Sequence, residues 1–136
     1  MIICDTGPLV ALFDPKDIDH LPCAETLQVI REPICATIPV LTEAFHLLGH
    51  QSVGSVRLRE FVESGGLSIW FFTRPALTRA FELMEAYRDH PMDLADASII
   101  VAAELLGARK VFTLDRNHFE SYRVRRGHRY FPLEIV

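Results

Sequence analysis

The chain has 136 residues, the length of one domain, and 49% of them are hydrophobic. This composition can build a core and excludes a disordered chain. No run of about 18 apolar residues could span a membrane, and the N-terminus lacks the basic start of a signal peptide. We therefore expect a cytoplasmic protein. The formal net charge of −4 argues against a protein that coats DNA, since such proteins are basic overall.

Apolar patterns predict strands and helices that alternate along the chain. Short, continuous apolar runs are typical of strands buried on both faces, and they predict strands at 1–5, 34–37, 67–72, 110–114 and 131–136. Helical spacing and breakers predict helices at 9–13, 17–31, 39–49, 52–63, 75–87 and from Met92 or Asp93 to Leu106. This order predicts a three-layer α/β/α fold with a central parallel sheet of four or five strands, and residues 1–136 form a single domain.

Two aspartates follow predicted strands. Asp5 ends the first strand, and Asp115 comes directly after the fourth. Each alone is also a common turn residue. In open α/β sheets, however, ligands bind at the carboxyl ends of the strands, and the two equivalent positions together indicate a site there.

Two further acids, Glu43 and Asp96, lie in the first turns of apolar helices. An acid at a helix N-terminus can simply complement the helix dipole, an explanation that fits Asp93 best, since Asp93 is also a candidate N-cap. It fits Asp96 less well, because the helix around Asp96 is apolar nearly all round and buried aspartates are rare unless paired or bound to a metal.

Four carboxylates in one cleft would repel one another unless a cation neutralised them. Mg²⁺ or Mn²⁺ suits a set of oxygen ligands of this kind. Such an ion can activate water and orient a phosphodiester, so the residues predict phosphodiester hydrolysis.

At this point the sequence resembles the PIN-domain family, specifically the VapC-type toxins of bacterial toxin–antitoxin pairs. Each of its motifs is short, and the specificity comes from their order and separation. The motifs are Asp5-Thr6-Gly7-Pro8-Leu9-Val10-Ala11-Leu12, Pro39-Val40-Leu41-Thr42-Glu43-Ala44, Leu94-Ala95-Asp96-Ala97-Ser98-Ile99 and Phe112-Thr113-Leu114-Asp115-Arg116-Asn117-His118-Phe119.

The resemblance implies a PIN-like domain that uses Mg²⁺ or Mn²⁺ to cleave RNA, forms a homodimer and is inhibited by a small antitoxin protein. Motif by motif, it gives four catalytic and metal-binding acids: Asp5, Glu43, Asp96 and Asp115. Thr6 and Thr113, in the same motifs, and the neighbouring Asp93 are expected to be supporting polar residues. Gly7-Pro8 departs from many relatives, which should alter the loop more than the chemistry.

Basic residues gather in one segment. Five arginines and one acid lie between Arg116 and Arg129, so this segment carries +4 while the rest of the chain carries −8. We expect four of them to hold the RNA backbone, since arginine forms forked contacts with phosphate: Arg116, Arg123, Arg125 and Arg126. A solvated arginine-rich turn, or pairing with an acidic antitoxin tail, are the alternatives.

Other classes of function fit less well. A catalytically silent PIN-like module that binds RNA or a partner is the main alternative, although all four acids are present. A phospho-acceptor receiver domain would have an acidic pair near the end of the first strand, where this chain has one aspartate. Glu43, His46 and His50 share a helical face, but a di-iron site would need a second such helix, which is absent.

Overall fold

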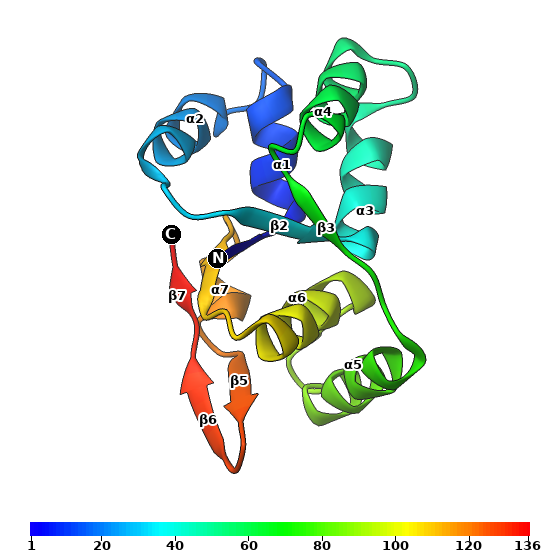
Figure 1. Cartoon of the computed structure of the whole chain (residues 1–136), viewed down its shortest axis with the longest axis vertical. Coiled ribbons are helices and arrows are strands. Elements are labelled where there is room, and N and C mark those ends of the chain that lie inside the picture. Colours follow the sequence, from blue (N-terminus) through cyan, green and yellow to red (C-terminus); the bar gives the residue numbers. More distant parts are fainter.

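The computed structural model describes residues 1–136 and contains a five-stranded sheet whose paired strands are all parallel (Figure 1). The strand order is β3-β2-β1-β4-β7. These strands are β1 (Ile2–Cys4), β2 (Ile34–Thr37), β3 (Ser68–Trp70), β4 (Lys110–Phe112) and β7 (Glu134–Ile135). The predicted parallel sheet is therefore confirmed.

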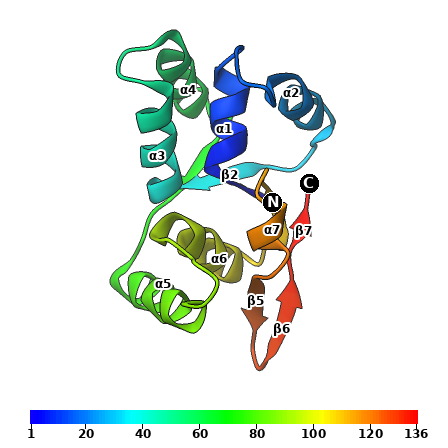
Figure 2. The ribbon, with the colours of Figure 1, turned by 180° about the vertical axis from the view of Figure 1, so that it is seen from behind.

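Helices cover both faces of this sheet, as expected for three layers (Figures 1 and 2). The first group, α1 to α4, lies on one face, and α5 and α6 lie on the other. Their bounds are α1 (Thr6–Phe13), α2 (His20–Val29), α3 (Ile38–Leu48), α4 (Val53–Glu63), α5 (Arg74–Ala86) and α6 (Leu94–Leu106). The short α7 (Arg116–Phe119) follows β4.

Local hydrogen bonds explain where the predicted ends of helices were wrong. The helix predicted from residue 9 begins at Thr6, because the Asp5 carboxylate accepts a hydrogen bond from the Thr6 N–H. The helix predicted at 17–31 is confined to α2, because aspartate side chains close turns ahead of it. In these turns Asp14 accepts from the Lys16 N–H and Asp17 accepts from the Asp19 N–H.

The sequence analysis missed an antiparallel hairpin formed by β5 (Arg123–Arg126) and β6 (Arg129–Pro132). Its turn is Gly127-His128, and Gly127 has φ of +63°, a conformation that favours glycine at the first position of a two-residue hairpin turn. The strand predicted at 131–136 is therefore divided. Residues 131–132 belong to this hairpin, and only β7 joins the main sheet.

Core residues lie on both faces of the sheet, and α6 is the most buried helix. Eight of its residues are buried: Ala95, Ala97, Ser98, Ile99, Ile100, Val101, Ala102 and Ala103. All three cysteines are buried and free of disulfides. None of the helices has the length and apolarity that crossing a membrane requires.

Candidate active site

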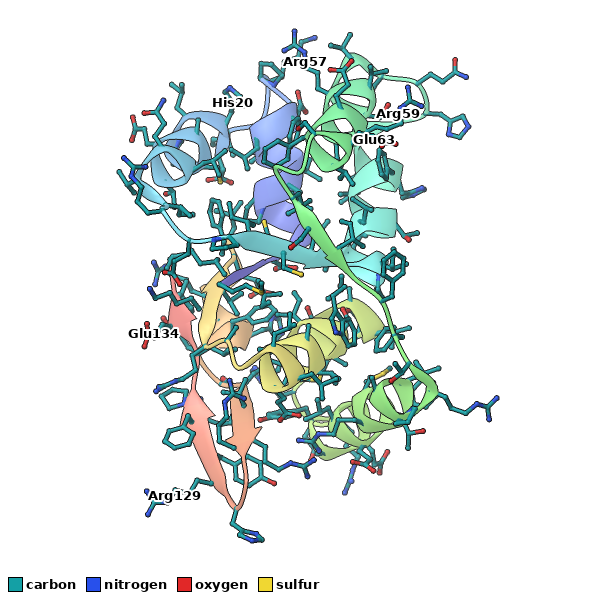
Figure 3. All side chains as sticks on the ribbon, viewed as in Figure 1. His20, Arg57, Arg59, Glu63, Arg129 and Glu134 are labelled. Carbon is teal, nitrogen blue, oxygen red and sulfur yellow. The ribbon has the colours of Figure 1, made fainter.

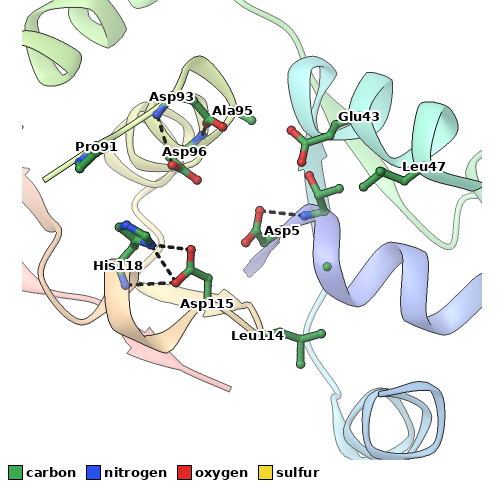
Figure 4. A pocket seen from close by; sticks show the side chains of 12 residues that line it. Asp5, Glu43, Leu47, Pro91, Asp93, Ala95, Asp96, Leu114, Asp115 and His118 are labelled. Carbon is green, nitrogen blue, oxygen red and sulfur yellow. Dashed lines mark hydrogen bonds and ion pairs between the residues drawn. The ribbon is translucent and has the colours of Figure 1, made fainter. Parts of the chain in front are cut away.

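An acidic pocket of about 440 Å³ opens where the carboxyl ends of β1 and β4 meet the first turns of α1, α6 and α7 (Figure 4). Five carboxylates and one imidazole line it, and no lysine or arginine does. The full lining is Asp5, Thr6, Gly7, Glu43, Leu47, Pro91, Asp93, Ala95, Asp96, Leu114, Asp115 and His118. The fold thus brings together all four acids that the sequence analysis selected.

Asp5 is the most enclosed of these acids. Its Oδ1 accepts a hydrogen bond from the Thr6 N–H at 2.7 Å, and its Oδ2 accepts one from Thr113 Oγ1 at 2.8 Å. Burial raises the pKa of Asp5, the bonds from Thr113 and Thr6 lower it, and the nearby carboxylates of Glu43 and Asp115 raise it further. The carboxylate is therefore held in place in an environment that disfavours its charge.

Thr113 connects two of the acids. While its hydroxyl donates to Asp5, the same oxygen accepts a hydrogen bond from the Asp115 N–H at 2.9 Å. Thr113 does not line the pocket, but it is buried beneath it, 3% exposed, and fixes Asp5 relative to the loop that carries Asp115.

Asp93 and Asp96 form a capping box at the start of α6. Asp93 Oδ1 accepts from the Asp96 N–H at 2.8 Å, and Asp96 Oδ2 accepts from the Asp93 N–H at 3.3 Å. Burial, followed by the charge of Asp93, raises the pKa of Asp96 to about 7. Capping explains the sequence position of Asp96, yet its charge remains costly in the pocket.

Asp115 caps α7 and is bound by His118, which the sequence analysis did not select for the site. The His118 N–H donates to Asp115 Oδ1 at 3.2 Å, and the ring Nδ1 lies 3.0 Å from Oδ1 and 2.8 Å from Oδ2. The spacing itself was the available signal, because an Asp and a His three residues apart at a helix start lie on one face.

Glu43, on α3, lines the wall of the pocket across from Asp96 and His118 (Figure 4). It is exposed and makes no hydrogen bond to another side chain. Its helix is anchored by Thr37, whose hydroxyl lies 2.6 Å from that of Ser98 on α6. This buried bond fixes the start of α3, and with it Glu43, relative to Asp96.

The donor set fits an oxygen-preferring cation. Every acid supplies carboxylate oxygens, and no lysine or arginine in the pocket balances their charge. Burial first, and neighbouring carboxylates after it, raise the pKa of Asp5 and of Asp96. The buried hydroxyl of Thr6, which lines the pocket, also has no hydrogen-bond partner. No group of three or more Asp, Glu, His or Cys side chains is itself arranged to hold a metal ion.

The predicted RNA-binding arginines lie outside this pocket. Arg116 is exposed at the start of α7, directly after Asp115. The other three, Arg123, Arg125 and Arg126, are on β5. The structure therefore brings the acids together and leaves the arginines on separate elements.

The parallel α/β/α fold and the acidic pocket at its strand ends define a PIN domain, and the chain belongs to the PIN domain family, whose sequence model matches residues 2–124. The resemblance drawn from the four motifs is thus confirmed. Among individual proteins, the chain is 26% identical over 125 residues to Ribonuclease VapC26 of Mycobacterium tuberculosis, covering 90% of this chain and 92% of that protein.

Solved structures share the fold. The chain superposes with a TM-score of 0.77 and 19% identity on M. tuberculosis VapC20, a sarcin-ricin loop cleaving toxin, covering 85% of this chain and 90% of that one. A toxin-antitoxin complex from Klebsiella pneumoniae gives a TM-score of 0.70 at 17% identity, with coverages of 89% and 92%. FitAcB from Neisseria gonorrhoeae gives 0.61 at 20% identity, with coverages of 88% and 91%.

Proposed function

We propose that this protein is an endoribonuclease that depends on Mg²⁺ or Mn²⁺ and acts as the toxin of a toxin–antitoxin pair. The observation that carries the proposal is the pocket of five carboxylates without a lysine or arginine. The similarity to a protein named Ribonuclease VapC26 supports RNA as the substrate.

In this proposal Asp5, Asp96 and Asp115 hold the cation, and Glu43 binds it or orients water from the opposite wall. The cation, when bound, supplies an activated water and stabilises the charge that develops at phosphorus. The protein's own groups keep the acids in place.

Each of the three acids that would hold the cation has its own support. Thr113 donates to the Asp5 carboxylate, and the Asp93 N–H donates to Asp96. His118 holds Asp115 through its main chain and its ring. Because the acids are oriented before substrate arrives, less reorganisation is needed during the reaction.

The proposed toxin would have an antitoxin protein as its partner. A neighbour of known structure is described as a toxin-antitoxin complex, which supports an antitoxin as the inhibitor. Leu47 and Leu114, 58% and 43% exposed at the pocket, offer apolar surface that such a protein would cover. A homodimer in the cytoplasm completes the proposal.

The test is cleavage of a total-RNA pool by purified protein with Mg²⁺, with Mn²⁺ and with EDTA. Asp96→Asn removes one pocket charge but keeps an oxygen that can accept from the Asp93 N–H. Asp89→Asn, an equal change at an exposed position outside the pocket, is the matched control. We expect discrete, metal-dependent products from the wild type and Asp89→Asn and none from Asp96→Asn.

Equal cleavage by all three proteins would reject the assigned site and point to a contaminating nuclease. If the wild type binds RNA but cuts nothing in the pool under any metal condition, the catalytically silent binding module becomes the better description.

A further inference from the structure

The β5–β6 hairpin is the most basic part of the molecule. Its residues 123–129 contain four arginines and one histidine without an acid, in a chain whose net charge is −4. The hairpin extends past α6 at the edge of the molecule in both views (Figures 1 and 2). Two of its arginines donate hydrogen bonds from their guanidinium groups to main-chain carbonyls, and two do not.

Arg126 and Arg123 are occupied by main-chain oxygens. The Arg126 guanidinium donates to the carbonyls of Ala103 and Ala108 at the C-terminus of α6, at 3.1 and 2.6 Å. The Arg123 guanidinium donates to the carbonyl of Glu120 at 2.7 Å. Both arginines therefore complete local structure, and both Nη atoms of Arg126 are engaged in this way.

Arg125 and Arg129 are exposed, and neither guanidinium has a hydrogen bond or an ion pair within the protein. Arg125 lies directly opposite Tyr130 in the hairpin register, so the two side chains share one face. Tyr130 is 61% exposed. Since Val124, on the other face, is fully buried, the Arg125–Tyr130 face is the one turned to solvent.

We propose that this hairpin is an arm that docks single-stranded RNA, with Arg125 and Arg129 on backbone phosphates and Tyr130 stacked on a base. The inference rests on the proposed function, because it takes RNA as the substrate. The acidic pocket contains no lysine or arginine that could attract a phosphate backbone, so the side chains that attract RNA lie outside it. Arg125 lies beside the exposed Tyr130 ring, and Arg129, opposite Arg126, is exposed next to the turn on the other face. Free guanidinium groups near an exposed aromatic ring are the combination that unpaired bases and phosphates require.

An acidic peptide is the rival ligand for the same charges. It would use the arginines but has no base for the Tyr130 ring. Removal of the Tyr130 ring should therefore weaken binding of RNA but not of an acidic peptide, so the affinity for each ligand is measured.

The first experiment measures the affinity of a short fluorescent single-stranded RNA as salt is varied, with EDTA present so that cleavage does not interfere. The double variant Arg125→Ala/Arg129→Ala is compared with Arg57→Ala/Arg59→Ala, which removes the same charge from exposed positions on α4. Arg57 and Arg59 lie at the opposite end of the molecule from Arg129 (Figure 3). We expect the slope of log K against the logarithm of the salt concentration to become shallower by about 1.4 in the hairpin variant, about 0.7 for each phosphate that is no longer neutralised. The slope of the α4 variant should equal that of the wild type.

The second experiment replaces the aromatic ring. Tyr130→Ala should weaken binding of the single-stranded RNA by about fivefold or more, whereas Tyr130→Phe should retain binding. RNA duplex, whose bases are already stacked, should be insensitive to either change. Arg126→Ala should lower the melting temperature, because Arg126 holds the C-terminus of α6, whereas Arg125→Ala/Arg129→Ala should not. The melting temperature thus distinguishes a loss of binding from a loss of folding.

Equal salt dependence in the hairpin and α4 variants would overturn the proposal. So would a hairpin variant that loses binding of a fluorescent polyglutamate peptide but keeps its affinity for RNA. Since binding is measured without metal, a protein that cuts no RNA can still pass or fail this test independently of the proposed nuclease activity.

Discussion

At the scale of single residues, His118 holds the Asp115 carboxylate at two points. It binds both oxygens of the Asp115 carboxylate through its ring and one of them through its N–H. The ring itself is confined, because the rings of His90 and Tyr122 lie 4.9 and 6.3 Å away, centroid to centroid. Asp115 therefore has a supporting partner of the kind that orients metal-binding carboxylates.

We expect His118→Ala to lower the affinity for Mg²⁺ or Mn²⁺ by about tenfold or more, because Asp115 loses the ring that orients it. The measurement is the rise in melting temperature as metal is added, without RNA. His118→Asn can still present an N–H to Asp115 and should recover most of the affinity. A metal titration of His118→Ala that matches the wild type would contradict this role.

At the scale of elements, α4 packs very closely against α1. A Cβ atom at Gly54 would lie 2.5 Å from the carbonyl oxygen of Phe13 and 3.1 Å from the Leu48 side chain. The Phe13 oxygen belongs to the main chain and has little freedom to move. The glycine is thus required for contact between the two helices.

Gly54→Ala should destabilise the protein by about 1–3 kcal/mol, because overpacking outweighs the gain of about 1 kcal/mol that alanine brings to a helix. Equilibrium unfolding in urea measures this change. Glu60→Ala, at an exposed position of the same helix, should stay within about 0.5 kcal/mol of the wild type. A more stable Gly54→Ala protein would mean that α1 and α4 separate easily.

At the scale of the whole molecule, we expect the free energy of unfolding to depend on pH through the acids of the pocket when no metal is present. Burial and neighbouring charges raise the pKa of Asp96 to about 7 and raise that of Asp5 as well. In the unfolded chain, aspartate titrates near about 3.9. The folded state therefore holds these protons more tightly, and the stability they contribute is lost as pH rises from about 4 through about 7.

In EDTA we expect the melting temperature to fall by a few degrees between pH 5.5 and pH 8. Asp96→Asn, which carries no charge at either pH, should reduce that decline and melt higher than the wild type at pH 8. If the melting temperatures of the two proteins changed in parallel with pH, ionisation of Asp96 would not lower the stability of the folded protein. Saturating Mg²⁺ should restore most of the wild-type stability at pH 8, since a ligand that binds only the folded state stabilises it.

Much of the fold could be predicted because its strands are buried on both faces. That burial produces the continuous apolar runs at β1 and β4, and those runs predict the parallel sheet. The β5–β6 hairpin escaped because one face of it is solvent-exposed and its strands carry arginines that break any apolar run. Pairing of β7 with β4 depends on contacts distant in sequence, which a local pattern does not contain.

The site was predictable to a similar degree. Asp5 and Asp115 could be placed together because parallel strands end at one edge, and Glu43 and Asp96 because polar groups are rare on apolar helices. The sequence could not reveal how the acids are supported. The link from Thr113 to Asp5 joins residues 108 positions apart, and only the folded chain brings these two side chains together.

The strand order also controls when the pocket can exist during synthesis. Asp5 directly follows β1, which pairs with β4, and Asp115 comes soon after β4. The pocket therefore cannot form around Asp5 until β4 and Asp115 have been made. Asp5 and Glu43 leave the ribosome well before Asp96 and Asp115, and a nascent chain that ends before Asp115 holds at most three of the four acids. Translation itself therefore delays assembly of the pocket until the chain has been made past Asp115.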